Sequence, residues 1–169
     1  MRNTLIIISG MVATGKTRFA EWLSQELCVP LLSLDELWEK AETTTIPFAQ
    51  YWIQCENLMK RSSPLIMEFG FWDEQKPVIN ELVENYSYKT INVHFCASIE
   101  EAHRRFNYRR EHDMGDSKPQ ITMEQYLKIV KHSKEFYFGN CVICVDTTDF
   151  SKISYDDIAR NIQQFAAIT

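Results

Sequence analysis

Hydrophobic residues along this chain gather in two kinds of segment: short unbroken runs, and longer stretches with a helical repeat. The short runs are rich in branched side chains, and unbroken apolar runs of this length are typical of parallel strands covered on both faces. They predict five buried strands, at residues 5–9, 29–34, 65–69, 90–96 and 141–146.

Between these runs, apolar residues recur at the three- and four-residue spacing of amphipathic helices. This spacing is found in Phe19, Trp22, Leu23 and Leu27, in Phe48, Trp52, Cys55 and Met59, and in Val78, Leu82 and Val83 after Pro77. Further helices are expected from about 99 to 111, from 123 to 138 and from 155 to 167. Strands that alternate with helices indicate βαβ units, so one three-layer α/β domain over residues 1–169 is predicted.

Composition and charge limit the function classes. With 45% hydrophobic and 24% charged residues, the chain has the make-up of a soluble globular protein. Its first apolar run, residues 5–8, is far shorter than the roughly 20 residues of a membrane-spanning helix, and it makes no secretory signal. A cytoplasmic protein is therefore expected. The net charge of −5 argues against long nucleic acid as a partner.

Five cysteines in such a chain are expected to be reduced thiols. Cys141 and Cys144 have the spacing of a redox or zinc pair, but in a strand their odd separation would place the two side chains on opposite faces. The four histidines show no paired ligand spacing either. A zinc site built by the protein is not predicted.

The segment Gly10-Met11-Val12-Ala13-Thr14-Gly15-Lys16-Thr17, here called the phosphate loop, fits the pattern GxxxxGK[ST] at every fixed position. Gly10 and Gly15 permit backbone conformations that a β-carbon would obstruct, so the amide groups can surround phosphate oxygens at the start of a helix. Lys16 supplies a cation for the β- and γ-phosphates, and the Thr17 hydroxyl is a ligand for Mg²⁺. The loop therefore predicts a site for a nucleoside triphosphate, ATP or alternatively GTP, with Mg²⁺.

Residues 5–17, with Asp35 just beyond the second predicted strand, resemble the small P-loop kinases of the nucleoside-monophosphate-kinase-like group. Within that group the chain is similar to the branch that contains chloramphenicol phosphotransferase, zeta toxins and the kinase domain of polynucleotide kinase. The order of elements agrees over nearly the whole chain, but the phosphate loop is the specific motif. The resemblance implies a five-stranded parallel sheet in the order 2-3-1-4-5, with a mobile helical lid inserted at about residues 104–122.

Two carboxylates follow predicted strands, at the edge where open α/β sheets bind ligands. Asp35 matches the family position that orients the attacking hydroxyl and accepts its proton, although Asp is also a favoured helix N-cap. Glu68 ends the third strand and is a candidate for holding Mg²⁺ through a water molecule or for binding the acceptor. The family more often has Asp there, and an ion pair with a lid arginine is the alternative.

Four arginines lie on the predicted helix 99–111. Arg105 and Arg109 share one face, whereas Arg104 and Arg110 are expected to point elsewhere. In the family, one arginine at the start of the lid stacks on adenine and others meet the phosphates, which the resemblance implies for Arg105 and Arg109. The alternative is a solvated helix face paired with nearby glutamates.

Together these residues predict an ATP- and Mg²⁺-dependent kinase that phosphorylates a hydroxyl group of a small molecule. One alternative is a regulatory ATPase or switch without a small acceptor. Another is a toxin-like or nucleic-acid-end kinase, but Leu37 and Trp38 stand where polynucleotide kinases carry an arginine. Aromatic residues around the expected acceptor pocket, such as Tyr51, Phe69 and Trp72, favour a flat or partly apolar acceptor.

Overall fold

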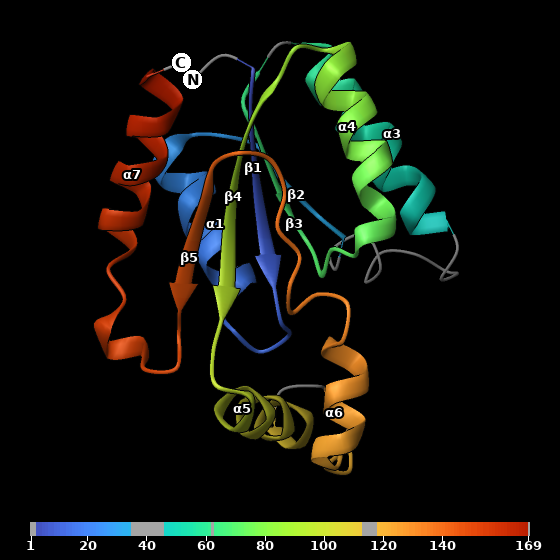
Figure 1. The fold of residues 1–169 in the computed structure, drawn as a ribbon, viewed down its shortest axis with the longest axis vertical. Helices are drawn as coiled ribbons and strands as arrows, with labels where there is room; N and C mark the ends of the chain where they lie inside the picture. Colours follow the sequence, from blue (N-terminus) through green and yellow to red (C-terminus); the bar gives the residue numbers. More distant parts are fainter. Residues whose placement is uncertain (1–2, 35–45, 62, 113–117, 169) are drawn as a thin grey trace.

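The computed structural model describes residues 3–34, 46–61, 63–112 and 118–168. Within these ranges, the strands form one parallel sheet whose order, β2-β3-β1-β4-β5, is the predicted one (Figure 1). The strands are β1 (Thr4–Gly10), β2 (Leu31–Ser33), β3 (Leu65–Glu68), β4 (Lys89–Cys96) and β5 (Val142–Asp146). The predicted second strand was too long at both ends.

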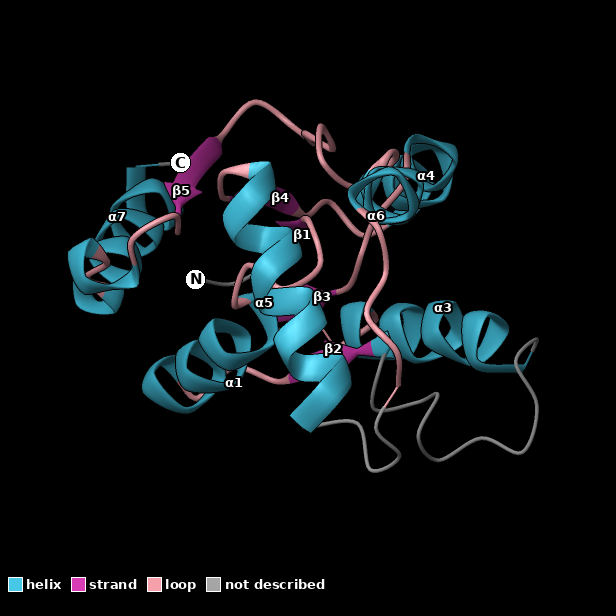
Figure 2. Ribbon diagram, turned by 90° about the horizontal axis from the view of Figure 1, so that it is seen from below, coloured by secondary structure: helices cyan, strands magenta, loops and turns pink. Residues whose placement is uncertain are grey.

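Helices cover both faces of the sheet, as Figures 1 and 2 show. One face carries α1 (Lys16–Leu27) and α7 (Tyr155–Ile168), and the other carries α3 (Ile46–Met59) and α4 (Lys76–Asn85). Short 3-10 turns, η1 (Asp73–Gln75) and η2 (Phe150–Lys152), precede α4 and α7. The remaining described helices, α5 (Ile99–His112) and α6 (Met123–Val130), lie beyond the carboxyl ends of the strands.

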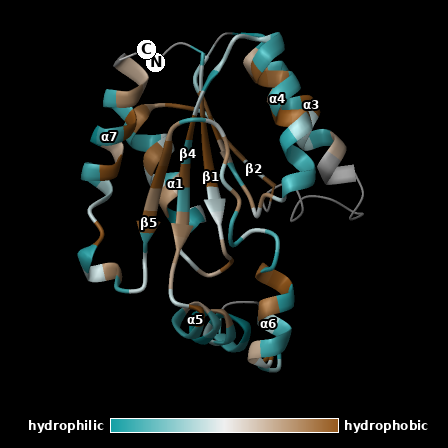
Figure 3. Ribbon diagram, viewed as in Figure 1, coloured by the Kyte–Doolittle hydropathy of each residue, from teal (hydrophilic) through white to brown (hydrophobic). Residues whose placement is uncertain are grey.

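The central strand β1 is buried along its whole length, which explains its unbroken apolar run. Ile6 and Ile8 face α1 and α7, whereas Leu5 and Ile7 face α3 and α4. Burying each such side chain contributes about 1.5–3 kcal/mol relative to leaving it in water. Figure 3 shows the strands largely in hydrophobic colours and α5 largely in hydrophilic ones.

The helix predicted from 123 to 138 is wrong in its second half. Helix α6 ends at Val130, and residues 131–140, here called the return arm, cross the α3/α4 face of the sheet before β5. Two arm residues enter the core there: Phe136 is fully buried and stacks on Phe71 at a centroid distance of 5.2 Å, and Phe138 is also buried. Tertiary packing of these rings therefore fixes the path of this segment.

The edge strand β5 places Cys141 and Cys144 as the odd spacing requires. Cys141, just before the strand, packs against the cluster beneath α1 and α7, whereas Cys144 is exposed. Both are free thiols. None of the helices in the described ranges has both the length and the apolar character needed to cross a membrane.

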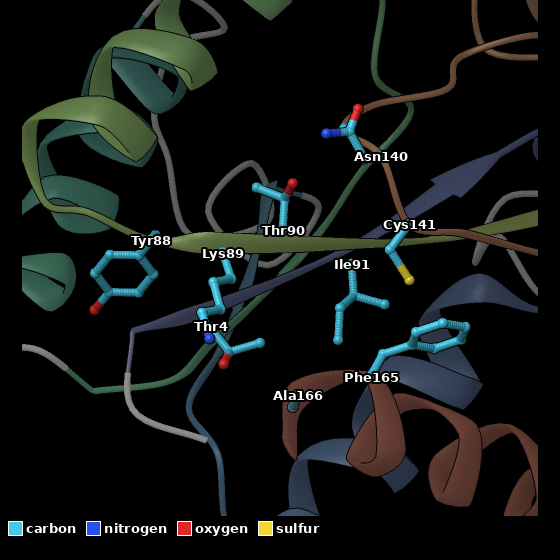
Figure 4. Close-up of a pocket in the computed structure, with 10 residues that line it drawn as sticks. Thr4, Tyr88, Lys89, Thr90, Ile91, Asn140, Cys141, Phe165 and Ala166 are labelled. Carbon is cyan, nitrogen blue, oxygen red and sulfur yellow. The ribbon is translucent and has the colours of Figure 1, made fainter. Parts of the chain in front are cut away.

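At the amino ends of the strands, a cavity of about 380 Å³ opens between the start of β4, the end of the return arm and the last turns of α7 (Figure 4). Thr4, Lys89 and Phe165 line it. Thr4 is the first residue of β1, and the phosphate loop lies at the other end of the same strand. The cavity and the loop are therefore at opposite ends of the strands.

Candidate nucleotide-binding site

The phosphate loop joins β1 to α1, and its two fixed glycines are required by the backbone. Gly10 has φ +126°, and a β-carbon placed there would lie 1.9 Å from the carbonyl oxygen of Phe95 on β4. Gly15 has φ +86° and is the N-cap of α1. Both conformations belong to the region that glycine tolerates best, so the sequence pattern reflects backbone shape as well as chemistry.

Side chains of the loop turn back onto its own backbone. The Thr14 hydroxyl donates to the Met11 carbonyl at 2.7 Å, and Lys16 Nζ donates to the same oxygen at 2.9 Å. Helix α1 begins at Lys16, without a side-chain cap and without an acidic residue in its first turn. Its amino end therefore keeps the partial positive charge and the free amide groups that favour an anion.

A carboxylate lies directly beside the loop. Thr17 on α1 donates its hydroxyl to Glu68 Oε1 at 3.3 Å, and Ser33 on β2 donates to Glu68 Oε2 at 3.1 Å. Glu68 is only 1% exposed, so both contacts orient a buried carboxylate at the carboxyl end of β3. The structure thus brings together the two residues predicted to serve Mg²⁺, and oxygen ligands of this kind suit that ion.

Sequence reasoning missed Ser33. The available signal was a polar residue at the end of an otherwise apolar strand, but its partner depends on the register of β2 against β3, in which Ser33 lies opposite Glu68. That register is fixed by contacts distant in the sequence.

A cavity of about 520 Å³ adjoins the phosphate loop. It is bounded by the phosphate loop, the first turn of α1, the middle of α5 and η2. Its lining residues are Ala13, Gly15, Arg18, Arg104, Arg105, Tyr108, Arg109 and Phe150. Four arginines around one opening give it a positive character in a chain whose net charge is −5.

Arg105 is held rigidly at this cavity. Its guanidinium donates to the carbonyl oxygens of Thr147 at 2.8 Å and Thr148 at 3.0 Å, and its Nε donates to Glu101 at 2.8 Å. The ring of Phe150 lies 4.2 Å from Cζ of Arg105 in a cation–π contact. These contacts place the segment after β5 beside the cavity.

Glu101 also binds a second arginine of α5. Arg104 reaches both of its carboxylate oxygens, at 2.7 and 2.8 Å. The pKa of Glu101 falls to about 2, chiefly through the hydrogen bond from Arg104. The ion pairs expected on a solvated helix face are therefore present on part of α5.

The four arginines of α5 do not separate into a cavity-facing pair and an outward-facing pair as predicted. Arg105 and Arg109 line the cavity as expected, but Arg104 lines it too, because residues adjacent on a helix differ by only about 100° and both can flank one opening. Arg110 points away and donates to the Pro119 carbonyl at 2.9 Å. Arg109 forms no ion pair within the ranges that the structure describes.

Two other predicted features cannot be placed in full. Asp35 and residues 113–117 of the predicted lid lie outside the described residues. Among the aromatic residues expected to wall an acceptor pocket, Tyr51 and Phe69 are buried in the core, whereas Trp72 is 38% exposed. Phe150 was missed by sequence reasoning; the available signal was an aromatic residue within the otherwise polar segment 149–152.

No family model and no curated protein matches this sequence. Solved structures resemble its fold over nearly its whole length. A protein from Chloroflexus aurantiacus, provisionally described as a kinase, has a TM-score of 0.81 and 21% identity, covering 97% of this chain and 98% of its own.

Two more distant likenesses are enzymes. A gluconokinase from Sinorhizobium meliloti has a TM-score of 0.61 and 13% identity, covering 94% of this chain and 88% of its own. The APS kinase of Mycobacterium tuberculosis, in complex with AMPPNP and APS, has a TM-score of 0.61 and 11% identity over 96% of both chains. Together with the sheet order, these likenesses show that the chain has the P-loop kinase fold.

Proposed function

We propose that this protein is an ATP-dependent kinase that transfers the γ-phosphoryl group to a hydroxyl of a small molecule. The observation that carries the proposal is the contact of Thr17 with the buried carboxylate of Glu68, directly beside a loop that fits GxxxxGK[ST]. The kinase fold of its structural relatives supports the same activity.

The triphosphate is bound by the backbone amides of residues 10–17 and by Lys16. In the structure Lys16 Nζ bonds to a carbonyl of the loop itself, so the ammonium group is already beside the site that the phosphates would enter. The nucleoside fits the adjoining cavity, where Arg105 and Phe150 offer flat surfaces for stacking.

Thr17 and Glu68 are the residues that would hold Mg²⁺. Their oxygen atoms form the donor set that a hard cation prefers, and one carboxylate with one hydroxyl leaves positions for water and phosphate oxygens. When bound, Mg²⁺ neutralises charge on the phosphate groups during transfer. Ser33 keeps the Glu68 carboxylate turned toward α1 by binding its second oxygen.

Asp35 is proposed as the group that accepts the proton of the attacking hydroxyl, on the strength of the resemblance and of its place after β2. The oxygen of the acceptor then forms the new bond to phosphorus, and ADP leaves. Arg109, which lines the cavity and has no ion-pair partner in the described chain, is the proposed cation for the moving phosphoryl group.

The test is the release of ADP in the presence of a panel of sugars, nucleosides and aminoglycoside-type alcohols. We expect one class to stimulate release, and Asp35→Asn to lower the stimulated rate by about a hundredfold or more while MgADP binding is retained. Glu84→Gln, in the last turn of α4, is the control carboxylate and should change neither quantity.

Equal hydrolysis with and without every acceptor would favour the regulatory ATPase instead. Phosphorylation of an oligonucleotide with a 5′-hydroxyl group would favour the nucleic-acid-end kinase.

A further inference from the structure

Three polar side chains lie behind the phosphate loop, inside the core. Ser9 on β1 and Asn92 on β4 are fully buried, and His94 on β4 is 1% exposed. Burying polar groups costs free energy unless each is hydrogen-bonded, so three of them on neighbouring strands need partners.

Their partners are backbone groups of the return arm. Asn92 Oδ1 accepts from the amide of Phe138 at 3.1 Å, and His94 Nε2 lies 3.0 Å from the carbonyl oxygen of Lys134. The Ser9 hydroxyl lies 3.2 Å from the carbonyl oxygen of Phe136. Side chains of β1 and β4 therefore bind backbone groups of three alternate residues of the return arm.

The three side chains also bind one another. Asn92 Nδ2 donates to Ser9 Oγ at 2.8 Å and to the Ile7 carbonyl at 3.0 Å, and Ser9 Oγ lies 3.0 Å from His94 Nδ1. Because the Lys134 carbonyl can only accept, Nε2 carries the proton of a neutral His94 ring. Nδ1 is then an acceptor. The Ser9 hydroxyl can therefore donate its proton either to Nδ1 or to the carbonyl oxygen of Phe136.

This network adjoins the start of the phosphate loop. Ser9 immediately precedes Gly10, and His94 immediately precedes Phe95, whose carbonyl oxygen closes the space beside Gly10. The start of the phosphate loop is thus held against β4 and its side chains.

A second contact reaches the loop from α6, the helix that leads into the return arm. The Tyr126 hydroxyl donates to the Val12 carbonyl at 2.9 Å, and Tyr126 and Val130 share a buried cluster with Met11. The arm and α6 are continuous in sequence, so an arm fixed to the sheet also fixes the helix that holds Val12.

We propose that His94 is a positioning residue of the nucleotide site, which anchors the return arm, and through it α6, so that the phosphate loop keeps its binding shape. The inference rests on the proposed nucleotide binding. If a nucleotide binds one arrangement of the loop, its apparent affinity falls with the fraction of molecules that hold this arrangement.

The experiment compares His94→Leu with His94→Gln. Leucine has no polar atom for Lys134 or Ser9, whereas the glutamine amide can reach the Lys134 carbonyl with a donor. Calorimetry measures the binding of MgADP, and hydrogen exchange measures the peptides that cover the return arm and the phosphate loop. Cys144→Ser is the matched control, because Cys144 lies opposite His94 in the β4–β5 register and is exposed.

For His94→Leu we expect MgADP affinity to fall about tenfold, the effect of losing the buried hydrogen bond to Lys134 that holds the arm, with faster exchange in both segments. His94→Gln should stay within about twofold of the wild type, like the control, because it restores the bond to Lys134. Wild-type affinity in His94→Leu, or unchanged exchange in the arm, would overturn the proposal.

If His94→Leu does not fold, Ser9→Ala removes the neighbouring hydroxyl with little change of volume. It should speed exchange in the arm and weaken MgADP binding, and a wild-type result in either measurement would overturn the proposal. Failure of the wild type to bind MgADP would instead refute the proposed function, while exchange in the arm would still report whether His94 anchors it.

Discussion

The hydroxyl of Thr17 donates to the carboxylate of Glu68 across 3.3 Å, from the first turn of α1 to the carboxyl end of β3. Glu68 is buried, and its other oxygen accepts from Ser33. Ser33 on β2 thus holds the carboxylate in the orientation in which it accepts the hydrogen bond from Thr17.

Glu68→Gln tests the role of this carboxylate. The substitution keeps the size of the side chain but removes the charge, so we expect the Mg²⁺ dependence of nucleotide binding to weaken by about 10- to 100-fold, as for other groups around metal sites. Titrations of ADP with and without Mg²⁺ measure it. Ser33→Ala, which leaves the charge in place, should have a smaller effect. Equal Mg²⁺ dependence in wild type and Glu68→Gln would show that Glu68 serves the acceptor or the fold instead.

Gly10→Ala should destabilise the protein. Its β-carbon would lie 1.9 Å from the Phe95 carbonyl oxygen, and φ of +126° is unfavourable for alanine, so the loss should exceed about 1–2 kcal/mol in the free energy of unfolding. Gly70→Ala is the control, because nothing lies within 4 Å of a β-carbon placed there. Denaturant unfolding measures both variants, and equal stability of the two would contradict the steric argument.

Sequence pattern predicted most of the fold because the central strands are buried on both faces. An unbroken apolar run such as Leu5–Ile8 does not have the pattern of an amphipathic helix. The phosphate loop in turn marks where α1 begins. The end of α6 was mispredicted: Phe136 and Phe138 are two residues apart, so they cannot share one face of a helix, and both pack into the core from the return arm.

The candidate site divides in the same way. Loop residues contiguous in sequence were predictable, because motif and backbone requirement coincide at Gly10 and Gly15. Ser33 and His94 were not, since each acquires its partner through strand register or through a segment some forty residues away. Their polarity within apolar strands was visible, but the residue that each would bind was not.

His94 should make stability depend on pH. Burial lowers the pKa of His94 below its ordinary 6.5, and the positive charge of Lys16 lowers it further, against the hydrogen bonds to Lys134 and Phe136. The unfolded chain therefore takes up a proton that the folded protein resists, so this contribution to stability is present above pH 6.5 and is lost as pH falls through the lowered pKa. The ring of Tyr137, 4.6 Å from His94, is uncharged in this range.

The comparison is with His94→Gln, which has no titrating group at this position. Between pH 7.5 and pH 5, the free energy of unfolding should fall more steeply in the wild type than in the variant, as measured by urea denaturation at each pH. Parallel curves would mean that His94 is protonated as easily in the folded protein as in the unfolded chain.

Arg105→Lys should weaken nucleotide binding even though the positive charge is kept. The planar guanidinium reaches Thr147, Thr148 and Glu101 at once, and a single ammonium group cannot reproduce that fork. The segment after β5 would lose its anchor, and the flat surface beside Phe150 would disappear with it. We expect MgADP affinity to fall about tenfold, consistent with two hydrogen bonds lost.

Inorganic tripolyphosphate, which has no base, should bind the wild type and Arg105→Lys alike. Arg110→Lys is the matched control, because Arg110 points away from the cavity toward Pro119. If Arg105→Lys weakened tripolyphosphate as much as MgADP, Arg105 would serve the phosphates and not the nucleoside.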